Sequence, residues 1–171
     1  MQKLVRLNGI IWYAPRLAAI SHSVKGHYEA EEIYAEDITD LVGAQLRECP
    51  SALLPDLSSP MMSCALADLR GVNLGGIDLE FTDFTGADLR GAFFNYGQHL
   101  RCLRGADLRG CNLRRMNCTG GDLRNADLRF ADLEDANFSR ANLSGAKLPA
   151  KDVDNPTISR DKGLGCILHS Y

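Results

Sequence analysis

The chain has 171 residues, with 19 Lys and Arg against 22 Asp and Glu, so its formal net charge is −3. This length suits one globular domain with a small appendage, and so mild a charge argues against a general polyanion binder. No apolar run approaches the roughly 18 residues that span a bilayer. The N-terminus also lacks the apolar core of a signal peptide. We therefore expect a cytoplasmic protein without membrane contact.

Residues 1–63 are predicted to form a small mixed α/β cap. Two apolar runs, Leu4–Leu7 and Ile10–Tyr13, flank Asn8-Gly9, a dipeptide typical of a two-residue type I′ hairpin turn. Apolar residues then recur at near-helical spacing from Glu29 to Glu48, with acidic residues between them, which predicts a helix. The segment carries eight acids against five bases, which is the whole net charge. We favour a cap on the adjoining repeat over an independent partner-binding module.

A five-residue repeat organises the chain from Ala67 to Ala150. The blocks read ADLRG, VNLGG, IDLEF, TDFTG, ADLRG, AFFNY and, from Arg101, RCLRG, ADLRG, CNLRR, MNCTG, GDLRN, ADLRF, ADLED, ANFSR, ANLSG, AKLPA. The third position is Leu or Phe in 15 of these 16 blocks, and the second is Asp or Asn in 13. A period of five fits neither a strand nor an amphipathic helix, but it fits a solenoid.

In such a solenoid the third residue and the small first residue of each block point inward. The predicted core is Leu69, Leu74, Leu79, Phe84, Leu89, Phe94, Leu103, Leu108, Leu113, Cys118, Leu123, Leu128, Leu133, Phe138, Leu143 and Leu148. Pro is absent from Met61 to Leu148, as stacked backbones need their N–H groups, and 11 of the 16 Gly fall in this stretch, where corners need permissive dihedral angles.

These blocks resemble the A(D/N)LXX pattern of the pentapeptide-repeat protein family. The resemblance implies an all-β solenoid, namely a right-handed quadrilateral β-helix with four blocks per coil, and the 16 blocks would make about four coils. Residues 64–150 would form this β-helix, with 151–171 as a C-terminal cap or tail. Family members also form homodimers through a rod end, which the sequence itself does not show.

One step of the repeat is irregular. The third-position residues Phe94 and Leu103 are nine positions apart instead of ten, so the segment from Asn95 to Leu100 is one residue short. We favour a bulge or a shortened corner over a functional loop.

The sequence contains no enzyme signature. His22, His27, His99 and His169 lie in no catalytic context, and no phosphate-binding, nucleophile-elbow or zinc-protease motif is present. His99, Cys102, Cys111 and Cys118 fit no standard zinc spacing. The many Asp residues recur because the repeat recurs. We therefore expect no enzyme, no cofactor and no metal.

Two functions remain. The first is a non-enzymatic scaffold that binds another macromolecule. We expect this partner to be a protein, for example one that binds nucleic acid. The alternative is implied by the resemblance: some bacterial or phage members act as DNA mimics toward DNA gyrase or related machines, including anti-defence targets. Between Cys64 and Leu148, however, ten Arg and one Lys balance eleven Asp and Glu, so the rod is neutral. Neutrality weakens mimicry, and direct nucleic-acid binding is not expected.

One face carries the most regular charges. Four blocks per coil stack Asp68, Asp88, Asp107 and Asp127 in one column and Arg70, Arg90, Arg109 and Arg129 in the next. We predict either a mutually neutralising ladder or a basic docking face. Arg104 and Arg124 would extend the basic character to a neighbouring face, as would Arg114 and Arg115, and Phe130 at a corner would serve as an aromatic anchor.

Overall fold

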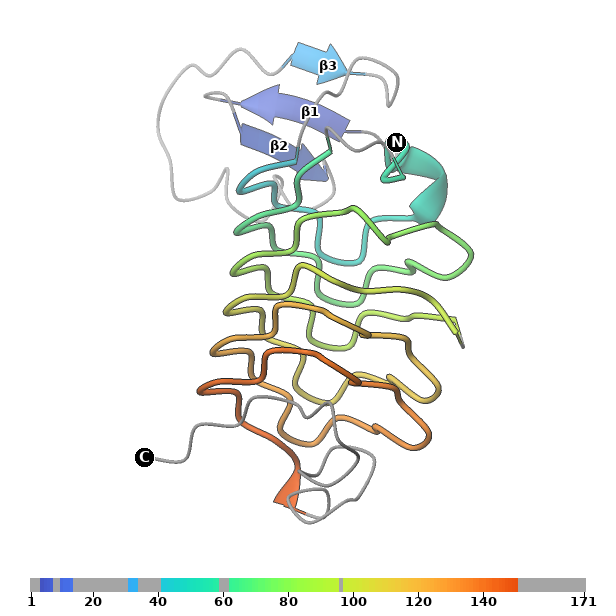
Figure 1. Ribbon diagram of the computed structural model, residues 1–171. Coiled ribbons are helices and arrows are strands. Elements are labelled where there is room, and N and C mark those ends of the chain that lie inside the picture. Colours follow the sequence, from blue (N-terminus) through green and yellow to red (C-terminus); the bar gives the residue numbers. More distant parts are fainter. Residues whose placement is uncertain are drawn as a thin grey trace.

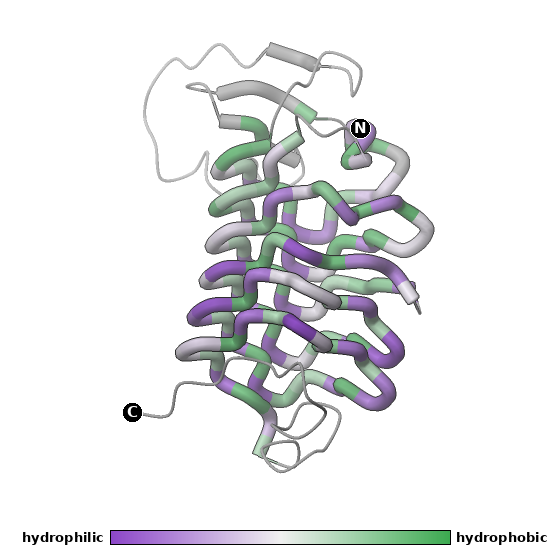
Figure 2. The backbone as a smooth tube through the Cα atoms, in the orientation of Figure 1, coloured by the Kyte–Doolittle hydropathy of each residue, from purple (hydrophilic) through white to green (hydrophobic). Residues whose placement is uncertain are grey.

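The computed structural model describes residues 4–7, 10–13, 31–33, 41–58, 62–95 and 97–150. From residue 41 onward the backbone winds into a stack of similar coils, with a small sheet at the N-terminal end (Figure 1). Hydrophobic and hydrophilic residues recur together along every coil (Figure 2).

Parallel β-bridges join the second residues of blocks one coil apart. One such column runs from Asp68 to Asp88, Asp107 and Asp127. Between blocks, except at the irregular step, the first residue of a block donates its N–H to the third-residue carbonyl of the block before, as Val72 does to Leu69 at 3.1 Å. Most blocks therefore supply one short strand contact and one tight turn, and a proline at either bonded position would remove a donor.

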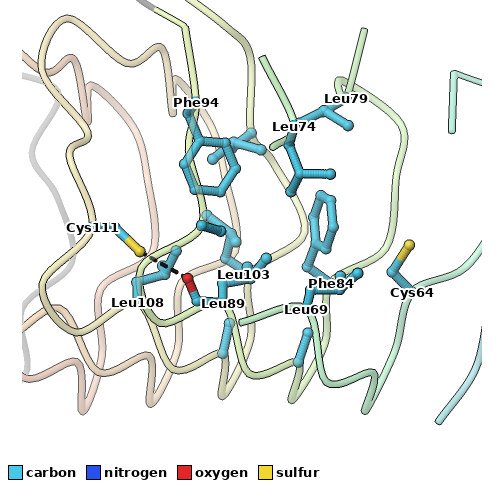
Figure 3. Packing of buried hydrophobic residues seen from close by; sticks show 14 of the residues in the cluster. Cys64, Leu69, Leu74, Leu79, Phe84, Leu89, Phe94, Leu103, Leu108 and Cys111 are labelled. Atoms are coloured by element: carbon cyan, nitrogen blue, oxygen red, sulfur yellow. Dashed lines mark hydrogen bonds between the residues drawn. The ribbon is translucent and has the colours of Figure 1, made fainter. Parts of the chain in front are cut away.

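The side chains at the third positions fill the interior. Figure 3 shows Leu69, Leu89 and Leu108 following one another on the same side of the core. All sixteen predicted core residues but Leu148 are buried. Leu148, in the last block, is only partly buried against the core, unlike its counterparts one coil earlier. Small first residues such as Ala67 and Ala87 are also fully buried.

Three strands form the N-terminal sheet. They are β1 (Leu4–Leu7), β2 (Ile10–Tyr13) and β3 (Glu31–Ile33), in the order β2-β1-β3 with antiparallel pairing. The pairing of β1 with β2 confirms the predicted hairpin; its Asn8-Gly9 turn lies outside the described residues. The sheet is attached to the solenoid, because the N–H of Gln45 donates to the carbonyl oxygen of Ile11 at 2.7 Å.

The helix predicted from Glu29 to Glu48 is wrong in the part that the structure describes. Residues 31–33 are the strand β3, and residues 41–48 stack on the first repeat: Leu41 donates to Ser63 O at 2.7 Å and Leu46 to Asp68 O at 2.8 Å. Leu41 and Leu46 are five residues apart, so they take consecutive third positions. A short 3-10 helix, η2 (Ser51–Leu53), follows. The mixed α/β description of the cap is therefore not supported by the described residues.

The irregular step is a redistribution of corner residues. The N–H of Leu100 donates to Asn117 O at 3.0 Å and that of Leu103 to Asp122 O at 2.9 Å, so both leucines take third positions. The two corner residues that normally separate such blocks are missing between Leu100 and Arg101, whereas three residues separate Phe94 from Gln98. One residue gained and two lost give the net deficit of one. The proposed tail, residues 151–171, lies outside the described residues.

Candidate functional site

The Asp and Asn side chains at the second positions stabilise the backbone of their own blocks. In all 13 blocks that carry Asp or Asn there, Oδ1 accepts the backbone N–H of the fourth residue, at 2.9–3.3 Å. This is the Asx-turn interaction, which explains why the repeat prefers these two residues. The recurring carboxylates therefore have a structural role.

Arginine at the fourth position binds the carboxylate of the same block with two donors. Nε and Nη2 of Arg90 donate to Oδ1 and Oδ2 of Asp88 at 2.8 and 2.6 Å. The same fork joins four further pairs: Arg70 with Asp68, Arg109 with Asp107, Arg124 with Asp122 and Arg129 with Asp127. Bidentate, charge-assisted contacts of this kind fix both side chains in one geometry.

Weaker contacts connect these pairs from coil to coil. Nε of Arg70 lies 3.4 Å from Oδ2 of Asp88, and Nε of Arg90 lies 3.5 Å from Oδ2 of Asp107. This face therefore has the geometry of a mutually neutralising ladder. Docking on its arginines stays a prediction, and it would have to compete with these internal carboxylates.

The arginines that bind these carboxylates shift their pKa values. Hydrogen bonds from the Arg124 and Arg129 side chains hold the pKa of Asp122 and of Asp127 below its usual value. For Asp88 partial burial raises the pKa, but the bonds and charge of Arg90 outweigh it and the net shift is downward. These carboxylates stay ionised at neutral pH, so none of them is suited to general acid catalysis.

Two fourth-position arginines, Arg104 and Arg114, have no carboxylate in their own block, and of the two only Arg114 forms ion pairs with the next coil, to Asp132 and Glu134. The block of Arg104 has Cys102 at the second position. Its exposed side chain makes no hydrogen bond or close ion pair with any residue that the structure describes, but its charge contributes to the lowered pKa of Asp122. Its neighbour Arg124, one coil further, is held by Asp122.

Two exposed apolar side chains occupy corners with a left-handed backbone. Phe130 has a φ of 63° and is 81% exposed, whereas Gly91 and Gly110 take the equivalent corner in the coils before it. It borders a mostly apolar groove lined also by Leu148 and Pro149. Leu66 has a φ of 60° and is 67% exposed.

Phe130 was singled out from the sequence, but Leu66 was not. The block Met62–Leu66 precedes the first block predicted from the sequence. Its third position carries Cys64 instead of Leu or Phe, so the sequence pattern does not indicate it. Ser63 provides the missing signal, because its Oγ accepts the N–H of Ala65 at 3.2 Å as an Asx residue would.

The imagined metal ligands do not converge. Cys111 and Cys118 are buried, and Cys111 Sγ donates to the carbonyl oxygen of Leu89 at 3.0 Å (Figure 3). His99, by contrast, is on the surface next to Asn117. Among the described residues no cluster of His, Cys, Asp and Glu could hold a metal ion. Nor does this part of the chain contain a helix long and apolar enough to cross a membrane.

Stacked parallel coils with one short strand contact per five residues define a β-helix solenoid. The part of the chain that forms these coils matches the family described as "Pentapeptide repeats", in 8 copies over residues 63–95, 102–140 and 122–149. The chain therefore belongs to the pentapeptide-repeat family, whose fold is a right-handed β-helix and whose members are typically non-enzymatic. Among curated proteins, no match was found.

Several solved structures are similar to this chain. HetL of the cyanobacterium Nostoc sp. strain PCC 7120, involved in heterocyst differentiation regulation, is 27% identical over 65% of this chain and 62% of its own, with a TM-score of 0.31. A thylakoid-lumen pentapeptide-repeat protein of Arabidopsis thaliana is 23% identical over 67% and 68%, with a TM-score of 0.28. QnrB1, a plasmid-mediated fluoroquinolone resistance protein, is 20% identical over 77% and 61%, with a TM-score of 0.45. The chain thus spans about three fifths of HetL and of QnrB1.

Proposed function

We propose that this protein is a non-enzymatic scaffold that binds another protein through side chains displayed on the faces and corners of its β-helix. The observation that carries this proposal is Phe130, an aromatic side chain 81% exposed at a corner with a φ of 63°. Glycine takes this corner at positions 71, 91 and 110, with φ values of 68°, 66° and 70°.

The residue at this corner is unfavourable on two counts. A left-handed conformation costs an L-residue about 1–2 kcal/mol, and an exposed phenyl ring gains little from burial in the free protein. Burial of the ring by a partner would recover that free energy, and large aromatic side chains are common hot spots of interfaces. Strained, exposed residues of this kind are typical of binding surfaces.

The rest of the molecule supports binding rather than catalysis. The interior of the described coils is filled with leucine, phenylalanine and alanine side chains. The carboxylates on the outside are held by backbone N–H groups and by arginines such as Arg90 and Arg109. A rigid surface with fixed charges suits recognition of another macromolecule.

The DNA-mimic role is the narrower alternative, with DNA gyrase or another DNA-binding machine as the partner. It requires an acidic face, but the column of Asp68, Asp88, Asp107 and Asp127 is neutralised by the arginines that bind it. A gyrase supercoiling assay separates the two ideas: inhibition or protection that survives the loss of the Phe130 ring would favour mimicry.

The proposal is tested by photo-crosslinking in the source cell. A benzophenone amino acid replaces Phe130 in one variant and Arg115 in the other, which is also a left-handed, exposed corner residue, with a φ of 56°. We expect a discrete crosslinked protein from position 130 and none from position 115. Absence of any product at 130, or identical products from both positions, would contradict the proposal.

A further inference from the structure

Arg104 lacks a carboxylate in its own block, whereas five other fourth-position arginines each bind the Asp of their own block. In five blocks with Asp at the second position and Arg at the fourth, the guanidinium donates two hydrogen bonds into the carboxylate of its own block, as Arg124 does to Asp122 at 2.8 and 2.6 Å. In the block 101–105 Cys102 replaces that Asp. The donor fork of Arg104 thus makes no hydrogen bond to a carboxylate of any described residue, although the charge of Arg104 contributes to the lowered pKa of Asp122, one coil further.

The neighbouring charges do not fill this vacancy. Arg101 is directed to Glu80, with Nη2 at 2.8 Å from Oε1, and Arg124 is held by Asp122. Asp83, one coil before Cys102, accepts the N–H of Thr85 at 2.9 Å. Asp83 and Asp122 therefore lie on the two sides of Cys102 along the column of second-position residues. Asp122 interacts with Arg104 only through its charge, and neither carboxylate is hydrogen-bonded to the Arg104 guanidinium.

Two coils before Arg104, toward the N-terminal end, the same edge presents Leu66. Leu66 occupies the corner position that glycine takes at Gly86 and Gly105, both with a φ of 67°. Its side chain lies over Gly86, because a Cβ added there would be 2.8 Å from Leu66 Cδ2. In the coil between Leu66 and Arg104 the equivalent corner positions carry Thr85 and Gly86, which have no long side chain.

We propose that this edge binds an extended acidic segment of a partner protein. A partner carboxylate takes the place of the missing Asp beside Arg104, and an apolar partner residue covers Leu66. Two coil spacings of about 4.8 Å correspond to one turn of an extended polyproline II segment, in which residues three positions apart lie on the same side at about 9 Å. The segment thus carries an apolar residue and an Asp or Glu about three positions apart. This inference rests on the proposed scaffold function but concerns a different contact from Phe130.

A protein segment fits this surface better than a nucleic acid does. Arginine binds carboxylates through two parallel donors, which is the geometry already present in the sister blocks. A nucleic acid carries a charge at every phosphate, so it would also meet Asp83 and Asp122 on this face and Asp107 on the next. A single acidic side chain brings only one charge to this face, and Arg104 neutralises it there as the arginines of the sister blocks neutralise their carboxylates.

The test is an NMR titration of the isotope-labelled full chain with a synthetic peptide containing Leu-Ser-Ser-Glu, its reverse Glu-Ser-Ser-Leu, and a single-stranded oligothymidine. The decisive variant is Cys102→Asp, which restores the internal carboxylate without removing any arginine. Cys102→Asn is the matched control, since Asn also occurs at second positions and keeps the Asx turn. Arg129→Ala removes an arginine that Asp127 already binds.

We expect at least one peptide to shift the signals of Leu66 and Arg104, and Cys102→Asp to weaken that binding at least tenfold. Cys102→Asn and Arg129→Ala should bind like the original chain, and Leu66→Asn should bind more weakly. Equal binding by the original chain and Cys102→Asp, or binding of oligothymidine alone, would overturn the inference. Crosslinking from position 130 is independent of these variants, so failure of this edge and failure of the scaffold function are distinguishable.

Discussion

The backbone N–H of Gln45 donates a 2.7 Å hydrogen bond to the carbonyl oxygen of Ile11, which joins the N-terminal sheet to the first coil. Strand β2 thereby covers the backbone edge that would otherwise be open to pairing with other chains. The buried side chains of Leu4 and Ile11 extend the apolar interior into the sheet.

This attachment predicts the effect of Ile11→Asp. A charge at this buried site should release the sheet and expose the edge of the first coil, so we expect soluble aggregates or higher oligomers in light scattering. Ile11→Val, which removes one methylene, should remain in its original oligomeric state. If Ile11→Asp behaves like Ile11→Val, the sheet is an independent module instead of a cap.

The interior assignment predicts a sharp contrast between adjacent residues. Leu128 is fully buried, whereas the Arg129 side chain is exposed. Leu128→Asp should cost several kcal/mol of unfolding free energy, measured by urea denaturation. Arg129→Ala should cost less than about 1 kcal/mol, as expected for a surface ion pair. Cooperative unfolding of Leu128→Asp at the original urea midpoint would contradict the inward position of Leu128.

Two substitutions of Asp88 separate its two interactions. Asp88→Asn keeps the oxygen that accepts the N–H of Arg90 but removes the charge, whereas Asp88→Ala removes both. We expect Asp88→Ala to cost about 1 kcal/mol more than Asp88→Asn, because an Asx turn is lost as well as an ion pair. Equal losses in thermal melting would mean that the ion pair alone matters.

The same residue predicts an acid response. The pKa of Asp88 is lowered from 3.8 in the folded chain by Arg90, against the opposing effect of burial. A lowered pKa adds stability above the unfolded value, and that stability is lost as the pH falls through the folded value. The melting temperature should therefore begin to fall at about pH 4, the unfolded pKa of an Asp. In Asp88→Asn this fall should be smaller than in the original chain; an unchanged profile would contradict the assignment.

The side chain of Gln98 joins the irregular coil to the coil before it, so substitutions of Gln98 should destabilise the protein. Nε2 of Gln98 donates to the carbonyl oxygens of Leu74 at 2.9 Å and Ile77 at 2.6 Å, in the preceding coil. Gln98→Ala should cost about 1–3 kcal/mol, and Gln98→Glu should cost more because a carboxylate would face two carbonyls. Chemical denaturation measures both variants. Greater stability of Gln98→Glu than of Gln98→Ala would contradict this contact.

The repeat could be predicted because one residue type performs one physical task in every block. Leucine fills the interior, Asp or Asn closes the turn, and glycine allows the corner, so a single sequence states the pattern many times. The hairpin was predictable for a similar reason, since Asn-Gly between two apolar runs is a strong local signal.

The parts that were missed depend on contacts between coils. Leu41 and Leu46 have the five-residue spacing, but the acidic and helix-favouring residues around them also fit a helix, and only stacking on Ser63 and Asp68 decides between the two. At the irregular coil the spacing gives the net loss of one residue. It does not show that Leu100 takes a third position, which follows from its pairing with Asn117.

The sequence already shows that Arg104 follows Cys102 instead of an Asp, yet we grouped Arg104 with the other arginines. The difference lies in Cys102, two positions earlier, and its meaning depends on knowing that Asp at this position binds the arginine of its own block. The Asx turns and the bidentate pairs supplied that knowledge.

The most direct test of the account is a paired measurement on Phe130→Gly. Glycine relieves the left-handed corner, so the melting temperature should stay the same or rise, with a gain of up to about 1 kcal/mol. Capture of the protein identified by crosslinking at position 130 should meanwhile fall at least tenfold. A stable Phe130→Gly variant that captures this partner as well as the original chain would contradict the claim that the exposed corner is kept for binding.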